Sequence, residues 1–177
     1  MLELLLLRHA KAQRDGSGDG GDHERDLAQR GLAAAAAMGR FMSGQRLIPD
    51  LALCSTATRT RRTWDLVAGA IGSKVRTRFL RELYLAPPAQ LLDIVRQQEG
   101  PRMLLLVGHN PGLHELAQKL AGGGEKALLK VLRQKLPTCG LVRLAFDKDA
   151  WGAVASGGGQ LAGYWRPKDL DGPDTEG

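Results

Sequence analysis

Continuous aliphatic runs alternate along this chain with longer stretches that have the composition and apolar spacing of helices. Uninterrupted apolar runs such as residues 103–107 are typical of strands that are covered on both faces. Alternating strands and helices predict an α/β fold in three layers, α/β/α, with a mainly parallel sheet. The last two strands are expected to pair antiparallel at its edge. The predicted strands are residues 1–7, 51–54, 74–79, 103–107, 140–146 and 160–165, and the predicted helices are residues 27–42, 59–70, 89–97, 111–120 and 125–132.

Glycine-rich and polar segments indicate where loops and chain ends lie. Residues 16–22 (GSGDGGD) are predicted as a flexible loop, and the glycines at 122–124 as the end of the preceding helix. With 177 residues, 43% of them hydrophobic, the chain can bury one sizeable core. We expect a single domain over residues 1–170, followed by a flexible acidic tail over residues 171–177.

Cysteine content and apolar run length favour a cytoplasmic protein. The two cysteines, Cys54 and Cys139, form no C-x-x-C pair, which argues against a zinc knuckle or a disulfide scaffold. The N-terminal apolar run at residues 4–7 is too short for a secretory signal. No run approaches the roughly 20 apolar residues of a membrane span, so no membrane partner is expected.

The formal net charge of +6 is concentrated in one segment. Residues 56–81 carry seven basic residues and a single acid, Asp65. Such an excess favours an anionic partner, namely phosphate, an acidic protein or nucleic acid, although a solvated basic face is an equal alternative. Nucleic acid is disfavoured, because aromatic side chains that could stack on a base are scarce near Arg59, Arg61 and Arg62, Trp64 apart.

Histidine and arginine side chains follow three of the predicted strands. Arg8 and His9 come directly after the first strand, Arg59 follows the second, and His109 follows the run at 103–107. In an open parallel sheet, ligands bind beyond the carboxyl ends of the strands. We therefore expect these four side chains to converge on one crevice.

Two imidazoles beside guanidinium groups favour phosphoryl transfer. Arginine binds phosphate through two parallel hydrogen bonds, and a neutral histidine can attack phosphorus. Nearby arginines disfavour the imidazolium and so favour the nucleophilic form. A metal site is not expected, since His109 and His114 lack the spacing of a zinc motif. His23 and His114 are interpreted as ordinary surface or packing residues, and no nucleotide or cofactor motif is present.

Three short motifs resemble those of the histidine phosphatase superfamily, which has the phosphoglycerate mutase-like fold. Residues 7–10 (LRHA) resemble its R-H-G/A signature, residues 55–63 its second arginine motif, and residues 107–110 (VGHN) its second histidine motif. The short chain and residues 25–31 resemble the SixA branch, the phosphohistidine phosphatases, with Asp26 in place of the usual proline.

This resemblance implies a role for each matched residue. His9 would be the nucleophile that becomes phosphohistidine, Arg8 and Arg59 would bind the phosphoryl oxygens, and His109 would contact the same group and stabilise the transition state. Arg25 would be an additional phosphate contact.

The identity of a proton donor stays open. Many members of the superfamily use an acid, and Glu82 is the best-placed candidate in this sequence. A surface carboxylate that pairs with Arg78 or Arg81 is an equal interpretation of Glu82.

The expected activity is that of a metal-independent phosphatase without a cofactor. It would hydrolyse phosphohistidine, on a signalling protein, through a covalent phospho-His9 intermediate, and it would act as a monomer. The alternatives are a general phosphatase of small phosphomonoesters and a non-catalytic sensor of phosphate or polyphosphate.

Overall fold

A computed structural model describes residues 1–14 and 20–170 of the chain. The predicted tail at 171–177 lies outside the described residues, as does most of the predicted loop at 16–22. The strands are β1 (Leu2–Arg8), β2 (Leu51–Ser55), β3 (Arg76–Leu80), β4 (Met103–Gly108), β5 (Ala121–Gly124), β6 (Leu141–Phe146) and β7 (Gly159–Trp165). The α-helices are α1 (Gln29–Gly44), α2 (Thr58–Ile71), α3 (Pro88–Arg96), α4 (Gly112–Leu120) and α5 (Lys126–Gln134). Four short 3-10 helices are η1 (Gly21–Glu24), η2 (Arg81–Leu83), η3 (Trp151–Ala153) and η4 (Pro167–Asp169).

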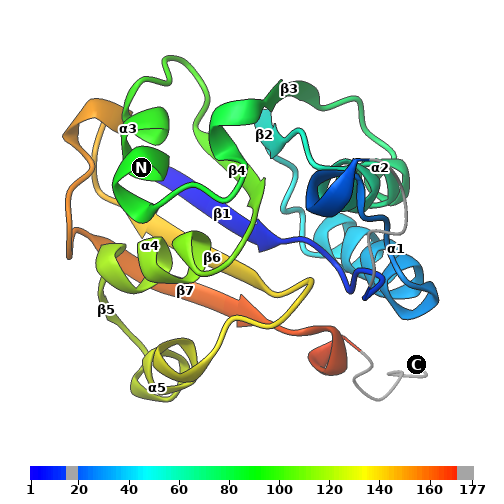
Figure 1. Cartoon of the computed structure of the whole chain (residues 1–177). Coiled ribbons are helices and arrows are strands. Elements are labelled where there is room, and N and C mark those ends of the chain that lie inside the picture. Colours follow the sequence, from blue (N-terminus) through cyan, green and yellow to red (C-terminus); the bar gives the residue numbers. More distant parts are fainter. Residues whose placement is uncertain (15–19, 171–177) are drawn as a thin grey trace.

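The strands form one mixed sheet in the order β3-β2-β4-β1-β6-β7-β5 (Figure 1). The first four strands in this order, β3, β2, β4 and β1, run parallel to one another, and β6 runs antiparallel to both β1 and β7. The predicted antiparallel pairing of the last two strands is therefore confirmed. The true edge lies one strand further out, because β5 pairs with β7 in parallel.

Strand β5 is the element that the sequence pattern did not predict. Its glycines do end the preceding helix, as expected, but they also form the edge strand. A Cβ atom on Gly122 would lie 1.8 Å from the carbonyl oxygen of Gly157, so only glycine allows this close approach. The strand thus depends on a tertiary contact that local propensity cannot indicate.

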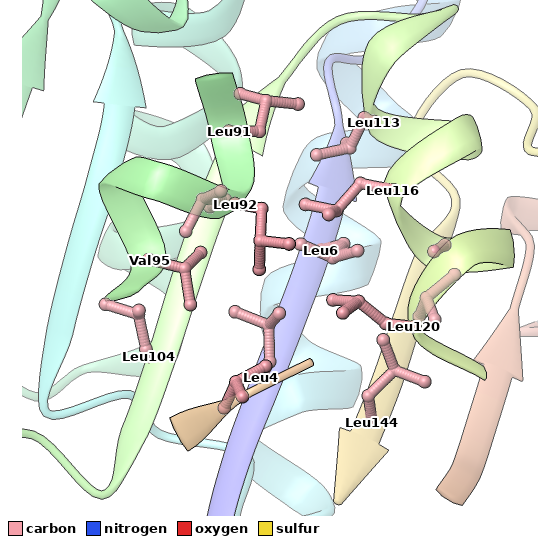
Figure 2. Packing of buried hydrophobic residues seen from close by; sticks show 14 of the residues in the cluster. Leu4, Leu6, Leu91, Leu92, Val95, Leu104, Leu113, Leu116, Leu120 and Leu144 are labelled. Carbon is pink, nitrogen blue, oxygen red and sulfur yellow. The ribbon is translucent and has the colours of Figure 1, made fainter. Parts of the chain in front are cut away.

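Two hydrophobic clusters, one on each face of the sheet, confirm the three-layer α/β/α architecture. Along β1, Leu4 and Leu6 point into one cluster, while Leu5 and Leu7 point into the other. Figure 2 shows Leu4 and Leu6 beneath side chains of α3 and α4. Helices α1 and α2 cover the opposite face. Because both faces of β1 are buried, its continuous run of leucines is the pattern that a central strand requires.

The pairing register places three strand ends at one level of the sheet. Arg8 pairs with Gly108 at the ends of β1 and β4, and Cys54 of β2 pairs with Val107 of β4. The residues that follow these positions therefore emerge side by side. Over the described residues, no helix has the length and apolar character to cross a membrane.

Candidate active site

A cavity of about 330 Å³ opens at the carboxyl ends of β1, β2 and β4. Five of the residues singled out from the sequence line it, namely Arg8, His9, Arg25, Arg59 and His109. The predicted convergence of these side chains on one crevice is thus observed.

The two histidines of the cavity face each other, with their ring centroids 5.5 Å apart. The backbone of His9 continues the sheet beyond β1, because its N–H donates to the carbonyl oxygen of Gly108 at 3.1 Å. The carbonyl of His9 in turn accepts a hydrogen bond from the N–H of Cys139 at 2.9 Å. These two bonds fix the position from which the His9 ring projects.

The His9 ring is held as the tautomer that a nucleophile needs. Its Nδ1 lies 2.8 Å from the carbonyl oxygen of Ala10, which can only accept, so Nδ1 carries the proton. Nε2 then presents its lone pair, and it has no partner among the described residues. Burial lowers the pKa of His9 to about 4, and the charges of Arg59 and Arg8 act in the same direction, against the opposing effect of the Ala10 hydrogen bond. His9 is therefore neutral near pH 7.

His109 is oriented by Ser55. Its Nε2 lies 2.7 Å from the Ser55 hydroxyl oxygen, which also accepts the N–H of Ala57 at 3.3 Å. The Ser55 hydroxyl donates its hydrogen to Nε2 of His109. Because Nε2 accepts, the proton of the neutral ring resides on Nδ1. Burial, followed by the charge of Arg59, lowers the pKa of His109 to about 3. A neutral ring thus carries a donor, Nδ1–H, in the wall of the cavity.

Three buried donors in this wall have no hydrogen-bond partner within the described residues. They are Nε of Arg8, Nε of Arg59 and Nδ1 of His109. The Arg8 guanidinium is anchored elsewhere by a bond from Nη1 to the carbonyl oxygen of Leu136 at 3.0 Å. An unpaired buried donor costs about 1–3 kcal/mol, and a bound anion would remove this cost. The wall is therefore suited to an oxyanion such as a phosphoryl group.

Asp22 and Tyr84 belong to the site and were not predicted from the sequence. The Asp22 carboxylate accepts hydrogen bonds from Arg59 Nη2 at 3.0 Å, from Arg25 Nη2 at 2.9 Å and from the Tyr84 hydroxyl at 2.5 Å. The Tyr84 hydrogen bond and the two arginines hold the pKa of Asp22 well below its usual range. Asp22 lies 37 positions before Arg59. It was predicted as the last residue of the flexible loop at 16–22, which gave no signal of this contact, whereas the structure has it in η1.

His23, interpreted from the sequence as a surface or packing residue, does pack. Its Nε2 lies 2.9 Å from the Thr56 hydroxyl oxygen, and its ring meets the Tyr84 ring edge-on at 4.8 Å. The Tyr84 ring also packs edge-on against the ring of His109, with the two ring centroids 5.4 Å apart.

The structure does not bring Glu82 into the cavity. Its side chain is exposed on η2 and lines a separate hollow, together with Arg78. Among the described ion pairs, none joins Glu82 to Arg78 or Arg81. Asp22 is therefore the carboxylate that the cavity contains. In the part of the chain that the structure covers, no three histidine, cysteine or acidic residues gather as a metal site would need.

The sequence is similar to those of known proteins. A family model described as the histidine phosphatase superfamily (branch 1) matches residues 4–85. An uncharacterised protein of Mycobacterium tuberculosis is 34% identical over 166 residues, which cover 92% of this chain and 100% of the relative. An uncharacterised chloroplastic protein of Arabidopsis thaliana is 29% identical, with coverage of 97% of this chain and 78% of the relative.

Solved structures resemble the whole fold. A crystal structure from Agrobacterium tumefaciens, provisionally named the phosphohistidine phosphatase SixA, superimposes with a TM-score of 0.79 at 29% identity. The match covers 94% of this chain and 98% of the other. A structure with the same provisional name from Nakamurella multipartitia gives a TM-score of 0.78 at 28% identity and covers 94% and 96% of the two chains.

Proposed function

The chain belongs to the histidine phosphatase superfamily and is SixA-like, and from this premise we propose that it hydrolyses phosphohistidine through a covalent intermediate on His9. The observation that carries the proposal is a neutral His9 ring whose Nε2 has no protein partner, in a wall with three unpaired buried donors. This combination supplies a nucleophile and a place for the oxygens of the group that it attacks.

The proposed reaction has two displacement steps. In the first, His9 Nε2 attacks phosphorus, the phosphorus–nitrogen bond of the substrate breaks, and the leaving imidazole takes a proton from solvent. In the second, water attacks the phosphoryl group on His9, inorganic phosphate leaves, and the neutral ring is restored. Arg8 and Arg59 would bind the phosphoryl oxygens, and His109 Nδ1–H would donate to the same group as negative charge develops.

The chemistry of the cavity supports a nitrogen leaving group over an alkoxide. Asp22 is ionised through its bonds to two arginines and Tyr84, so it holds no proton to donate near neutral pH. Glu82 lies outside the cavity, and a neutral His109 is a weak acid. A departing alkoxide needs an acid beside it, whereas an imidazole nitrogen is basic enough to be protonated by solvent.

A series of leaving groups tests this proposal. The experiment measures kcat/KM in the presence of EDTA for free phosphohistidine, for aryl phosphates with acidic phenols and for simple alkyl phosphates. We expect phosphohistidine and the most acidic phenols to exceed the alkyl phosphates by about 100-fold or more, since an acid catalyst contributes roughly that factor. EDTA should leave every rate unchanged.

Other outcomes would identify the alternatives. Comparable rates for alkyl phosphates would indicate a general phosphatase of small phosphomonoesters with an acid that the geometry does not reveal. Binding of phosphate without turnover of any substrate would indicate a sensor. Strong inhibition by EDTA would contradict metal independence.

A further inference from the structure

A second cavity, of about 660 Å³, adjoins the active-site cavity and shares Lys11 and Thr138 with it. It runs along α1. Residues of η4, which contacts α1 near the end of the described chain, also line it (Figure 1). We call it the α1 groove. Because the two cavities share part of their walls, a molecule seated in the active site can extend into the groove.

The α1 groove is lined by four basic side chains and no acidic one. They are Lys11, Arg30, Arg40 and Lys168, and all four are exposed. Within the described residues, none of them forms an ion pair or a side-chain hydrogen bond. The active-site arginines differ, because Asp22 binds Arg59 there. The groove therefore holds positive charge that residues 1–14 and 20–170 do not neutralise.

Helix α1 gives the groove its length and its floor. Arg30, Ala33, Ala37 and Arg40 are spaced by three, four and three residues, which places them on one face of the helix. At a rise of 1.5 Å per residue, the two arginines are separated by about 15 Å along the axis. The alanines between them leave the floor low and apolar. Part of the alanine-rich run thus faces this groove.

Two features indicate that the charge of the groove is not incidental to the fold. Arg30 occupies the first turn of α1, where a positive charge opposes the helix dipole and where α1 has no acidic residue. Lys11 is held against the same helix, since a Cβ atom on Gly31 would lie 2.1 Å from the Lys11 carbonyl oxygen. The backbone of Lys11 is therefore fixed beside α1, and Lys11 lines both the groove and the active-site cavity.

We propose that the α1 groove binds a carboxylate-rich surface of the protein that carries the phosphohistidine. This proposal rests on the proposed function. The span of about 15 Å exceeds what one small phosphate ester would cover. No aromatic side chain lines the groove, so it lacks the stacking surfaces that single-stranded nucleic acid uses. Charge complementarity of this kind accelerates encounter and selects the partner.

The groove differs from the basic segment that the sequence draws attention to. Of residues 56–81, only Arg59 lines the active-site cavity. Arg61 stacks over the ring of Phe79 at 4.6 Å, and Arg62 lies 3.7 Å from the Asp26 carboxylate. The positive charge that adjoins the active site, and that has no ion-pair partner within the described residues, comes from α1, Lys11 and η4.

Two synthetic peptides provide the test. Each carries one phosphohistidine, flanked in the first by six glutamates and in the second by six glutamines. For the wild-type protein at low salt, we expect kcat/KM to be about tenfold or more higher for the glutamate peptide, the lower end of electrostatic steering. This ratio should fall towards one at high salt.

The variant Arg30→Glu/Arg40→Glu should abolish the preference and leave turnover of the glutamine peptide unchanged. The matched control is Lys126→Glu/Lys130→Glu, which makes the same change of charge on exposed residues of α5 that line neither cavity. The control should keep the preference. Equal rates for the two peptides with the wild type, or a preference that survives in Arg30→Glu/Arg40→Glu, would overturn the proposal.

The test separates failure of the groove from failure of the proposed function. If neither peptide is dephosphorylated, the function is wrong, and the groove is then judged by binding of the unphosphorylated glutamate peptide. Weaker binding to Arg30→Glu/Arg40→Glu than to the control supports the groove, and equal binding overturns it. Tighter binding of duplex DNA than of the glutamate peptide, lost in the same variant, would overturn the assignment to an acidic protein.

Discussion

Strand β1 has a cavity at each of its ends, and the two differ in chemistry more than in size. The cavity at the amino end, beside Leu2, measures about 570 Å³, against about 330 Å³ at the carboxyl end beside His9. Its lining balances two basic residues, Arg96 and Arg102, against two acidic ones, Glu99 and Asp149.

Hydrogen bonding separates the two ends most clearly. At the amino end, Arg96 donates from Nε to the Val154 carbonyl oxygen at 2.8 Å, and Trp151 donates from Nε1 to Pro101 at 2.7 Å. At the carboxyl end, the buried donors of Arg8, Arg59 and His109 are left without partners in the described structure. The polar side chains beside the larger cavity thus bond to the protein's own backbone, whereas the smaller cavity offers donors to an anion. Nε of Arg143 is also unpaired but lines neither cavity, so the convergence of several unpaired donors on one cavity, rather than volume, indicates where the chemistry occurs.

Removal of the His9 ring should have the largest effect. His9→Ala should lower kcat by at least about 10⁴-fold, because no other group replaces a covalent nucleophile. Circular dichroism and the thermal midpoint should be near those of the wild type, since the ring faces a cavity. His114→Ala, which alters a histidine that is bonded to Leu132 and does not line the active-site cavity, is the control and should turn over substrate within about twofold of the wild type. Activity near wild type in His9→Ala would refute the nucleophile.

The next largest effect should come from a substitution beside the cavity at the amino end of β1, and it should change the stability of the protein but not its activity. Trp151 is 2% exposed and packs against Phe146, so Trp151→Ala should lower the free energy of unfolding by about 3–5 kcal/mol. Measured at a temperature where the variant stays folded, kcat/KM should be unchanged. A loss of more than tenfold in kcat/KM would show that the two ends are coupled, which contradicts the comparison.

Arg59→Ala should lower kcat/KM by about 10²–10³-fold, equivalent to about 3–4 kcal/mol of transition-state stabilisation. Arg59 is 2% exposed, lines the active-site cavity and has a buried Nε without a partner among the described residues. Arg62→Ala is the matched control on the same helix, because Arg62 is exposed and pairs with Asp26. Steady-state kinetics with p-nitrophenyl phosphate would measure both. An equal fall of kcat/KM in both variants would show that the effect comes from the loss of any positive charge near the site and not from a contact made by Arg59.

The pH dependence should show the smallest effect. The neutral form of His9 is the nucleophile and its pKa is about 4, so activity should fall only as the pH drops through about 4. At pH 5.5 an unperturbed histidine would be only about one-tenth neutral, whereas His9 should be almost entirely neutral. NMR titration of the ring nitrogens would measure this directly. A midpoint near 6.5 would contradict the electrostatic account of the cavity.

The same shift of pKa affects stability in a defined window. Between about pH 6.5 and pH 4, the unfolded chain protonates His9 while the folded protein does not. The free energy of unfolding should therefore decline as the pH falls through this window, and the decline should be smaller in His9→Ala.

Sequence reasoning placed residues correctly where their location follows from the end of a buried strand. His9, Arg59 and His109 come directly after, or soon after, buried runs, and parallel pairing brings such ends together by geometry alone. It could not find Asp22 or Tyr84, because their contacts with Arg59 depend on how η1 and η2 approach α2. It left Glu82 open as either a proton donor or a surface carboxylate, and only the course of η2 shows that this side chain lies outside the cavity. Strand β5 was missed for a related reason, since Gly122 and its neighbours become a strand only when β7 is present.

The central claim is that phosphoryl transfer passes through His9. The most direct measurement is rapid quenching into alkali during turnover, followed by peptide mapping by mass spectrometry. We predict a phosphoryl group on His9 Nε2 that forms and decays at rates consistent with kcat, is lost in acid and is absent from His9→Ala. Turnover without a phosphorylated enzyme, or a phosphoryl group on another residue such as His109 or Ser55, would contradict the account.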